Sequence, residues 1–119
     1  MTTPSPGPSL LYCPDRGDFV WLDFDPIRGH EQRGRRPALV LTRRVFNERG
    51  GLCLACPVTS TDLGFSFDVK LPQGLQVKGV IRAHHLRSLS WTERQCEFLS
   101  KCPHEVFSEV LARVKALLE

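Results

Sequence analysis

The chain has 119 residues, of which 41% are hydrophobic and 24% charged, and its formal net charge is +3. This length predicts one domain with a modest core, and the composition excludes a largely disordered or membrane-embedded chain. The small positive charge favours an anionic partner, although dedicated nucleic-acid modules are usually more basic.

Residues 1–14 are rich in Pro, Ser and Thr and predict a flexible N-terminal arm, with the folded domain spanning residues 15–119. The arm lacks the basic stretch and the long apolar run of a secretory signal, and the five cysteines are an odd number. We therefore expect a reduced, cytoplasmic protein that does not associate with a membrane.

Apolar runs and apolar–polar alternation predict strands near residues 19–24, 37–42, 52–60, 65–71 and 79–83, with a short extended piece at 86–89. Gly50-Gly51 signals a turn before the third strand. From Pro103 onward the apolar residues fall at helical spacing, which predicts an amphipathic helix to the C-terminus. The predicted fold class is therefore mainly β with α: a small, strongly bent antiparallel sheet, most economically a partly open barrel, with one C-terminal helix.

Cys53 and Cys56 have the spacing of half a zinc site, and Cys96, Cys102 and His104 would have to supply the other half. Residues three apart on a strand point to opposite faces and cannot both bind one metal. Buried free thiols are the better interpretation, and we expect neither a metal nor another cofactor.

Side chains that can bind phosphate or transfer protons are concentrated in three places. Arginine, histidine and hydroxyl groups together suit a phosphodiester substrate, because guanidinium groups neutralise phosphate and imidazole moves protons near neutral pH. RNA carries its own nucleophile, the 2′-hydroxyl, so this set of residues favours RNA over DNA. The three places are the loop with His30, Glu31, Gln32, Arg33, Arg35 and Arg36, the strand end with Thr59, Ser60 and Thr61, and the later segment with Arg82, His84, His85 and Arg87.

Each of these residues also has a structural interpretation. Loop arginines are often solvated charges, a threonine at a strand end often serves a turn, and only one of two consecutive histidines on a strand faces a given site. On the residues alone, an anion-binding barrel is at least as economical as a ribonuclease.

Three blocks of sequence, "GDFVWLDFDPIRGHEQRGRRPALVLT", "CPVTS" and "GVIRAHHLRSLSW", resemble the MazF/PemK (Kid) family of toxins from bacterial toxin-antitoxin modules. The resemblance runs from about Gly17 through the C-terminal helix. It implies an SH3-like barrel that works as a homodimer and cleaves single-stranded RNA, chiefly mRNA, at specific sequences without metal, leaving 2′,3′-cyclic phosphate and 5′-hydroxyl ends. It also implies neutralisation by a MazE-like antitoxin, with which such toxins bind DNA.

The resemblance also implies roles for single residues. Arg36 and Thr59 match the catalytic arginine and threonine, and His30 matches a stabilising histidine. Arg82 matches an arginine acid of the PemK branch. Glu31 and Gln32 match the motif that shapes the RNA site, and we expect Arg33, Arg35, Ser60 and Arg87 to contact RNA.

One departure from the family pattern concerns the base. Many members have Asp-Gln where this chain has His84-His85, so the carboxylate base cannot be carried over. We hypothesise that His84 takes part in proton transfer or substrate contact, with His85 turned away.

A second hypothesis is a non-enzymatic toxin on the same barrel that inhibits a protein target such as gyrase. Such toxins act through a C-terminal Trp-Gly-Ile ending, whereas this chain ends in Leu117-Leu118-Glu119. The nuclease is therefore the preferred prediction.

Overall fold

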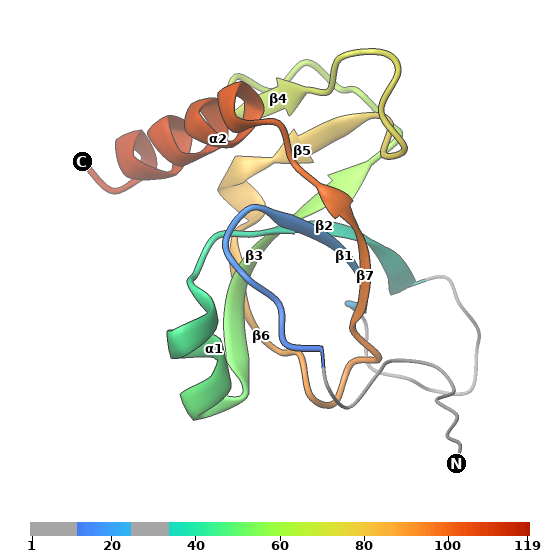
Figure 1. Ribbon diagram of the computed structural model, residues 1–119. Helices are drawn as coiled ribbons and strands as arrows, with labels where there is room; N and C mark the ends of the chain where they lie inside the picture. The colour runs from blue at the N-terminus through green and yellow to red at the C-terminus, as the bar shows by residue number, and fades with distance from the viewer. Residues whose placement is uncertain (1–11, 25–33) are drawn as a thin grey trace.

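The computed structural model describes residues 12–24 and 34–119. Within them, strands form one bent antiparallel sheet in the order β4-β5-β3-β2-β1-β7, with β6 paired to β3 as well (Figure 1). Helix α2 lies across one end of this sheet, and helix α1 lies beside β3 (Figure 1). The strands are β1 (Asp18–Asp23), β2 (Arg35–Val40), β3 (Leu52–Thr59), β4 (Asp68–Lys70), β5 (Val80–Arg82), β6 (Arg87–Ser90) and β7 (Glu97–Lys101).

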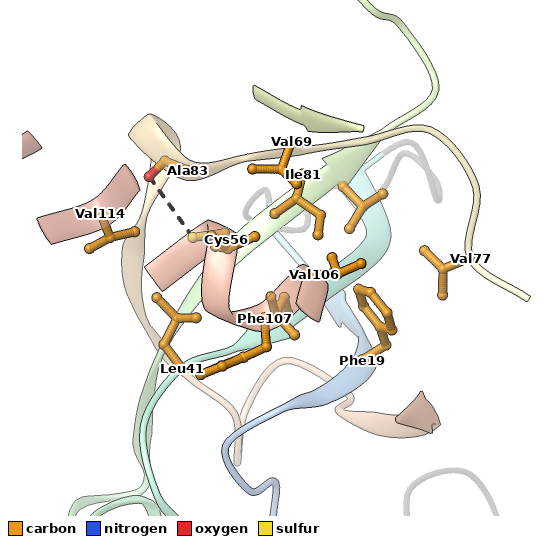
Figure 2. Close-up of a cluster of buried hydrophobic side chains, with 13 residues drawn as sticks. Phe19, Leu41, Cys56, Val69, Val77, Ile81, Ala83, Val106, Phe107 and Val114 are labelled. Carbon is orange, nitrogen blue, oxygen red and sulfur yellow. Dashed lines mark hydrogen bonds between the residues drawn. The ribbon is translucent and has the colours of Figure 1, made fainter. Parts of the chain in front are cut away.

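Strand β1 has apolar side chains on both faces, and each face enters a different core. Phe19 lies in a cluster with Leu39, Cys56 and residues of α2, part of which Figure 2 shows. Val20 and Leu22 point the other way, into a second cluster with Ala38 and Cys53. The strand is thus buried on both sides, as its nearly continuous apolar sequence predicts.

Strand β3 connects the strands β2, β1 and β7 on one side of it with the strands β5, β4 and β6 on the other. One edge pairs with β2, and the other pairs with β6 along its first half and with β5 at its last residues. The antiparallel sheet with a C-terminal helix confirms the predicted fold class. The predicted barrel does not close within the described residues, because no pairing joins the outer strands β4 and β7.

Helix α2 (His104–Leu117) begins where Pro103 predicts it. Its buried stripe consists of Val106, Phe107, Val110 and Val114, which complete the first core cluster. Glu105 in the first turn and Lys115 in the last complement the helix dipole.

Other elements differ from the sequence-based expectation. The strand predicted at residues 65–71 is paired only over β4, and β7 was not predicted. His84 and His85 were expected on a strand. They lie instead in a 3-10 helix, η2 (Ala83–His85), directly after β5. Helix α1 (Arg44–Gly50) was also missed, and Gly51 ends it in a left-handed conformation rather than forming a simple turn.

Helix α1 escaped prediction because it has no apolar stripe. Its only buried residue is Asn47, whose side-chain amide donates hydrogen bonds to the carbonyls of Pro14 at 2.8 Å and Thr42 at 3.0 Å. A polar anchor of this kind leaves no periodic hydrophobic signal in the sequence.

The thiols of Cys53 and Cys56 lie in different core clusters, on opposite faces of β3. Burial raises the pKa of both to about 12. All five cysteines are free, and Cys53 and Cys56 behave as small apolar core residues.

The predicted flexible arm lies mostly outside the described residues. At its end, the Tyr12 hydroxyl donates a hydrogen bond of 2.7 Å to the buried carboxylate of Asp18. This contact attaches the chain to β1 just before the sheet begins.

Candidate functional site

The pairing of β2 with β3 sets two of the predicted site residues opposite each other. The register matches Ala38 with Pro57, Leu39 with Cys56 and Val40 with Ala55. Continuing it by two residues places Arg36 opposite Thr59. Because side chains on a strand alternate, both lie on the same face of the sheet.

A cavity of about 310 Å³ opens at this point, and we call it the Arg36 cavity. Its walls carry cationic and hydroxyl groups and, among the described residues, no carboxylate. They are formed by Arg35, Arg36 and Pro37 of β2, by Val58, Thr59 and Ser60 around the end of β3, and by Lys78 before β5.

The two arginines of this cavity differ in their partners. Arg35 donates to Asp23 at 3.1 Å and to Glu97 at 2.6 Å, so its guanidinium ties β2 to β1 and β7. Arg36 makes no ion pair with another described residue and is half-buried. As far as the described residues go, Arg36 therefore keeps its hydrogen-bond donors available, whereas Arg35 has a structural role that the sequence did not reveal.

The Thr59 hydroxyl oxygen accepts a hydrogen bond of 3.2 Å from the Thr61 backbone N–H. This contact orients the hydroxyl and leaves its own proton free to donate. Gly79 lies against the carbonyl of the same residue: a Cβ at position 79 would come within 2.1 Å of the Thr59 oxygen. The side chain of Thr59 is thus held by Thr61, and its backbone packs against Gly79.

Arg82 also contacts the segment 59–61, but its surroundings differ from those of Arg36. Its side chain is 8% exposed and sits 3.5 Å from the Asp68 carboxylate, itself 4% exposed. It also donates to the Thr61 carbonyl at 2.7 Å, and its guanidinium stacks over Phe65 at 4.9 Å. We call Phe65, Phe67, Asp68, Arg82 and His84 the Arg82 cluster.

His84 belongs to this cluster and does not line the Arg36 cavity. Its ring packs edge-on against Phe65 at 5.4 Å and Phe67 at 6.4 Å, and its Nδ1 is buried without a hydrogen-bond partner among the described residues. His85 is exposed, with its ring 4.5 Å from that of His84. Partial loss of hydration, followed by the nearby charges of His84 and Arg82, lowers the pKa of His85.

Five further site residues are predicted by the sequence. His30, Glu31, Gln32 and Arg33 are outside the described residues, so their predicted contacts stay predictions. Arg87 is exposed and lies near Phe24, with Nη1 at 3.4 Å from the carbonyl oxygen and the guanidinium 5.6 Å from the ring centre.

Lys78 is the cavity residue that the sequence did not single out. It stands alone in an unremarkable loop, without the arginine neighbours or the motif that drew attention to residues 30–36. The pairing of Val80 with Thr59 and the packing of Gly79 against Thr59 bring it to the cavity.

The arrangement of these side chains suits the binding of an anion. Arg36 and Lys78 supply positive charge, and Thr59 and Ser60 supply hydroxyl donors. In residues 12–24 and 34–119, no three His, Cys, Asp or Glu side chains gather as potential metal ligands. No helix in this part of the chain is long and apolar enough to cross a membrane.

Comparison with known proteins identifies relatives along nearly the whole chain. The sequence profile of a family described as "PemK-like, MazF-like toxin of type II toxin-antitoxin system" matches residues 15–118. The endoribonuclease toxin MazF of Escherichia coli strain K12 is 36% identical over 107 residues, covering 90% of this chain and 96% of that protein.

Solved structures agree with this match. The crystal structure of MazF from Deinococcus radiodurans (form I) superimposes with a TM-score of 0.82 at 50% identity, covering 90% of this chain and 97% of that one. A MazE-MazF crystal structure from the same organism (form II) gives a TM-score of 0.83 at 50% identity, with 90% and 96% covered. The resemblance seen in the sequence is confirmed, and the chain belongs to the PemK-like, MazF-like toxin family of type II toxin-antitoxin systems.

Proposed function

We propose that this chain is an endoribonuclease toxin that cleaves single-stranded mRNA at a specific short sequence in the cytoplasm, without a metal ion. The observation that carries the proposal is the Arg36 cavity, where an arginine without an ion-pair partner among the described residues faces a threonine hydroxyl and no carboxylate lines the wall. The names of the curated relatives, such as endoribonuclease toxin MazF and endoribonuclease PemK, support the same activity.

In the proposed reaction the 2′-oxygen of one ribose attacks the adjacent phosphorus, and the bond from phosphorus to the 5′-oxygen breaks. The 2′-hydroxyl loses a proton and the departing 5′-oxygen gains one, which leaves a 2′,3′-cyclic phosphate and a 5′-hydroxyl. Negative charge builds on the two non-bridging oxygens in between. Arg36 and the Thr59 hydroxyl, whose proton is free, are the donors that stabilise this charge.

Arg36 acts through charge and hydrogen bonds rather than by releasing a proton. A guanidinium has a pKa above about 12 and does not deprotonate under ordinary conditions. The proton transfers therefore need another group. His84 is the candidate that the sequence offers, but it does not line the Arg36 cavity and its Nδ1 is buried, so it would have to act through its other ring nitrogen and an intervening water.

Other residues extend the proposed RNA contacts. His30, Glu31, Gln32 and Arg33 would shape the RNA site, and Ser60 and Arg87 would contact the RNA. Arg35 was also predicted to contact RNA, but its guanidinium is paired with Asp23 and Glu97, which favours a structural role. The buried position of Arg82 favours a role in holding the segment 59–61 over direct contact with RNA.

The proposed partners follow from the family. Because a relative at 50% identity crystallised as MazE-MazF, we propose a MazE-like antitoxin as the partner that neutralises this toxin and binds DNA with it. We also propose that the toxin itself is a homodimer.

The test is incubation of a long RNA with the purified protein in EDTA, followed by mapping of the cut positions and the end groups. The proposal expects cuts at one short sequence with cyclic-phosphate and 5′-hydroxyl ends, no cleavage by Arg36→Ala, and normal cleavage by Arg43→Ala, which removes an exposed arginine elsewhere. Cleavage only after a divalent metal is restored contradicts the metal-free mechanism. No cleavage under any condition favours a toxin that inhibits a protein.

The assignment of His84 has its own test. His84→Ala should slow cleavage and change the pH dependence of the rate. Full cleavage by His84→Ala across a pH series, while Arg36→Ala is inactive, would remove His84 from the reaction.

A further inference from the structure

A second cavity adjoins the first, and Lys78 lines both. The second cavity has a volume of about 370 Å³ and is formed by Leu71, Pro72, Gln73, Gly74, Lys78 and Gly79. Cavities of about 300–1,000 Å³ are the size that takes small ligands or single groups of larger ones. Lys78 therefore stands at the junction between the Arg36 cavity and a neighbouring polar cavity.

Lys78 is held at this junction by the residues on either side of it. Val77 is 2% exposed and belongs to the first core cluster (Figure 2). Gly79 has a φ of +113° and lies so close to the Thr59 carbonyl that no side chain fits between them. The backbone of Lys78 is thus fixed next to Thr59, although its side chain is exposed.

The loop that forms the second cavity is also closed at its base. The Leu71 N–H donates a hydrogen bond of 2.9 Å to the Gly79 carbonyl, and β4 pairs with β5 immediately outside it. Gly74 allows the turn with a φ of +94°. The cavity is therefore part of a connected hairpin.

The charge of Lys78 is available for a ligand. Among the described residues, no carboxylate lies within ion-pair distance of it, whereas Lys70 on the neighbouring strand pairs with Asp62 at 3.4 Å. Gln73 adds an amide that can both donate and accept hydrogen bonds. A cation and an amide in one cavity suit a nucleotide, because the lysine can bind a phosphate and the glutamine can bind the edge of a base.

We propose that the RNA strand continues from the Arg36 cavity into this second cavity, where Lys78 binds a backbone phosphate next to the scissile one. Gln73 then faces the base of the neighbouring nucleotide. The inference rests on the proposed ribonuclease function and adds to it a second phosphate subsite on a loop that the sequence did not mark.

The test uses a short single-stranded RNA that carries the mapped cleavage sequence and a 2′-deoxy sugar at the cut, so that it binds without reacting. Affinity is measured at several salt concentrations for wild type, Lys78→Ala and Lys115→Ala, the last removing an exposed lysine from α2. We expect Lys78→Ala to bind roughly tenfold more weakly at low salt, and the slope of log K against log salt to fall by about 0.7, the value for one single-strand phosphate contact. Lys115→Ala should match wild type in both.

A second measurement locates the phosphate. RNAs with one neutral methylphosphonate at successive positions are bound to wild type and to Lys78→Ala. At the phosphate adjacent to the cut, the modification should weaken binding to wild type but have little further effect on Lys78→Ala, since the two changes remove the same contact.

The inference is wrong if Lys78→Ala equals Lys115→Ala in affinity and salt slope, or if every methylphosphonate weakens both proteins equally. These results leave the ribonuclease standing, because wild type still cuts the unmodified RNA. If wild type neither cuts nor binds RNA, the proposed function fails first.

Discussion

The Arg36 cavity and the Arg82 cluster each contain an arginine, and the two arginines are used in opposite ways. Arg36 lines an open cavity with hydroxyls and a lysine and has no ion-pair partner among the described residues. Arg82 is almost completely buried, close to a carboxylate, a carbonyl and an aromatic ring. An arginine with free donors can bind a substrate phosphate, whereas one that is already engaged holds the protein together.

The two regions are connected through three residues. Arg82 donates to the Thr61 carbonyl, and the Thr61 N–H donates to the Thr59 hydroxyl oxygen. Arg82 thus reaches the cavity indirectly, by fixing the segment that orients Thr59. We therefore expect Arg82 to affect cleavage only through the position of Thr59.

The largest effect on stability should come from Arg82→Ala. Removing the guanidinium leaves the Asp68 charge buried without compensation, which typically costs about 3–5 kcal/mol. Chemical denaturation measures the loss of unfolding free energy. The double change Arg82→Ala with Asp68→Ala should recover part of it, and a single variant as stable as wild type would show that the pair is not structural.

Arg36→Ala should give the opposite result: normal stability and a loss of cleavage. Removal of one donor from a developing oxyanion typically costs about 3–4 kcal/mol, or 10² to 10³ in rate. Single-turnover cleavage of an RNA oligonucleotide measures it. Near-normal cleavage by Arg36→Lys would show that a positive charge is sufficient and that the planar guanidinium is not required.

Gly79→Ala should lower both the stability of the protein and the rate of RNA cleavage, each to a smaller extent. The new Cβ meets the Thr59 carbonyl oxygen at 2.1 Å and the residue keeps an unfavourable φ, which together should cost about 1–3 kcal/mol of stability and displace the Thr59 hydroxyl. Gly17→Ala is the matched control, because its φ is also positive, no atom lies within 4 Å of the added Cβ, and it lines neither the Arg36 cavity nor the second cavity. Equal cleavage by the two variants would show that Thr59 does not depend on Gly79.

The smallest effect concerns pH. Partial loss of hydration, His84 and Arg82 lower the pKa of the exposed His85, while Asp68 acts in the opposite direction. A histidine whose pKa is lower in the folded state binds fewer protons there than when unfolded, so stability falls as the pH drops through the ordinary value of about 6.5. His85→Gln should therefore lose less stability than wild type between neutral pH and about pH 5.5 in thermal unfolding. Equal pH dependence of stability in wild type and His85→Gln would contradict the assignment.

The sequence predicted the parts of the molecule that depend on local pattern. The apolar run of β3 and the helical spacing of α2 predicted these elements almost to the residue. The "RRPALVLT" and "CPVTS" blocks singled out Arg36 and Thr59, which line the same cavity and whose catalytic roles stay predictions. It could not predict α1, whose anchor is the single polar side chain of Asn47. It also missed the ion pairs of Arg35 and the position of Lys78, since both depend on contacts between strands distant in sequence.

The most direct test of this account is a crystal structure of the protein with an RNA that carries a 2′-deoxy sugar at the cleavage position. The account predicts that the scissile phosphate lies in the Arg36 cavity, with its non-bridging oxygens within hydrogen-bond distance of the Arg36 guanidinium and the Thr59 hydroxyl. A scissile phosphate bound instead at Arg82 and His84, with the Arg36 cavity empty, would contradict it.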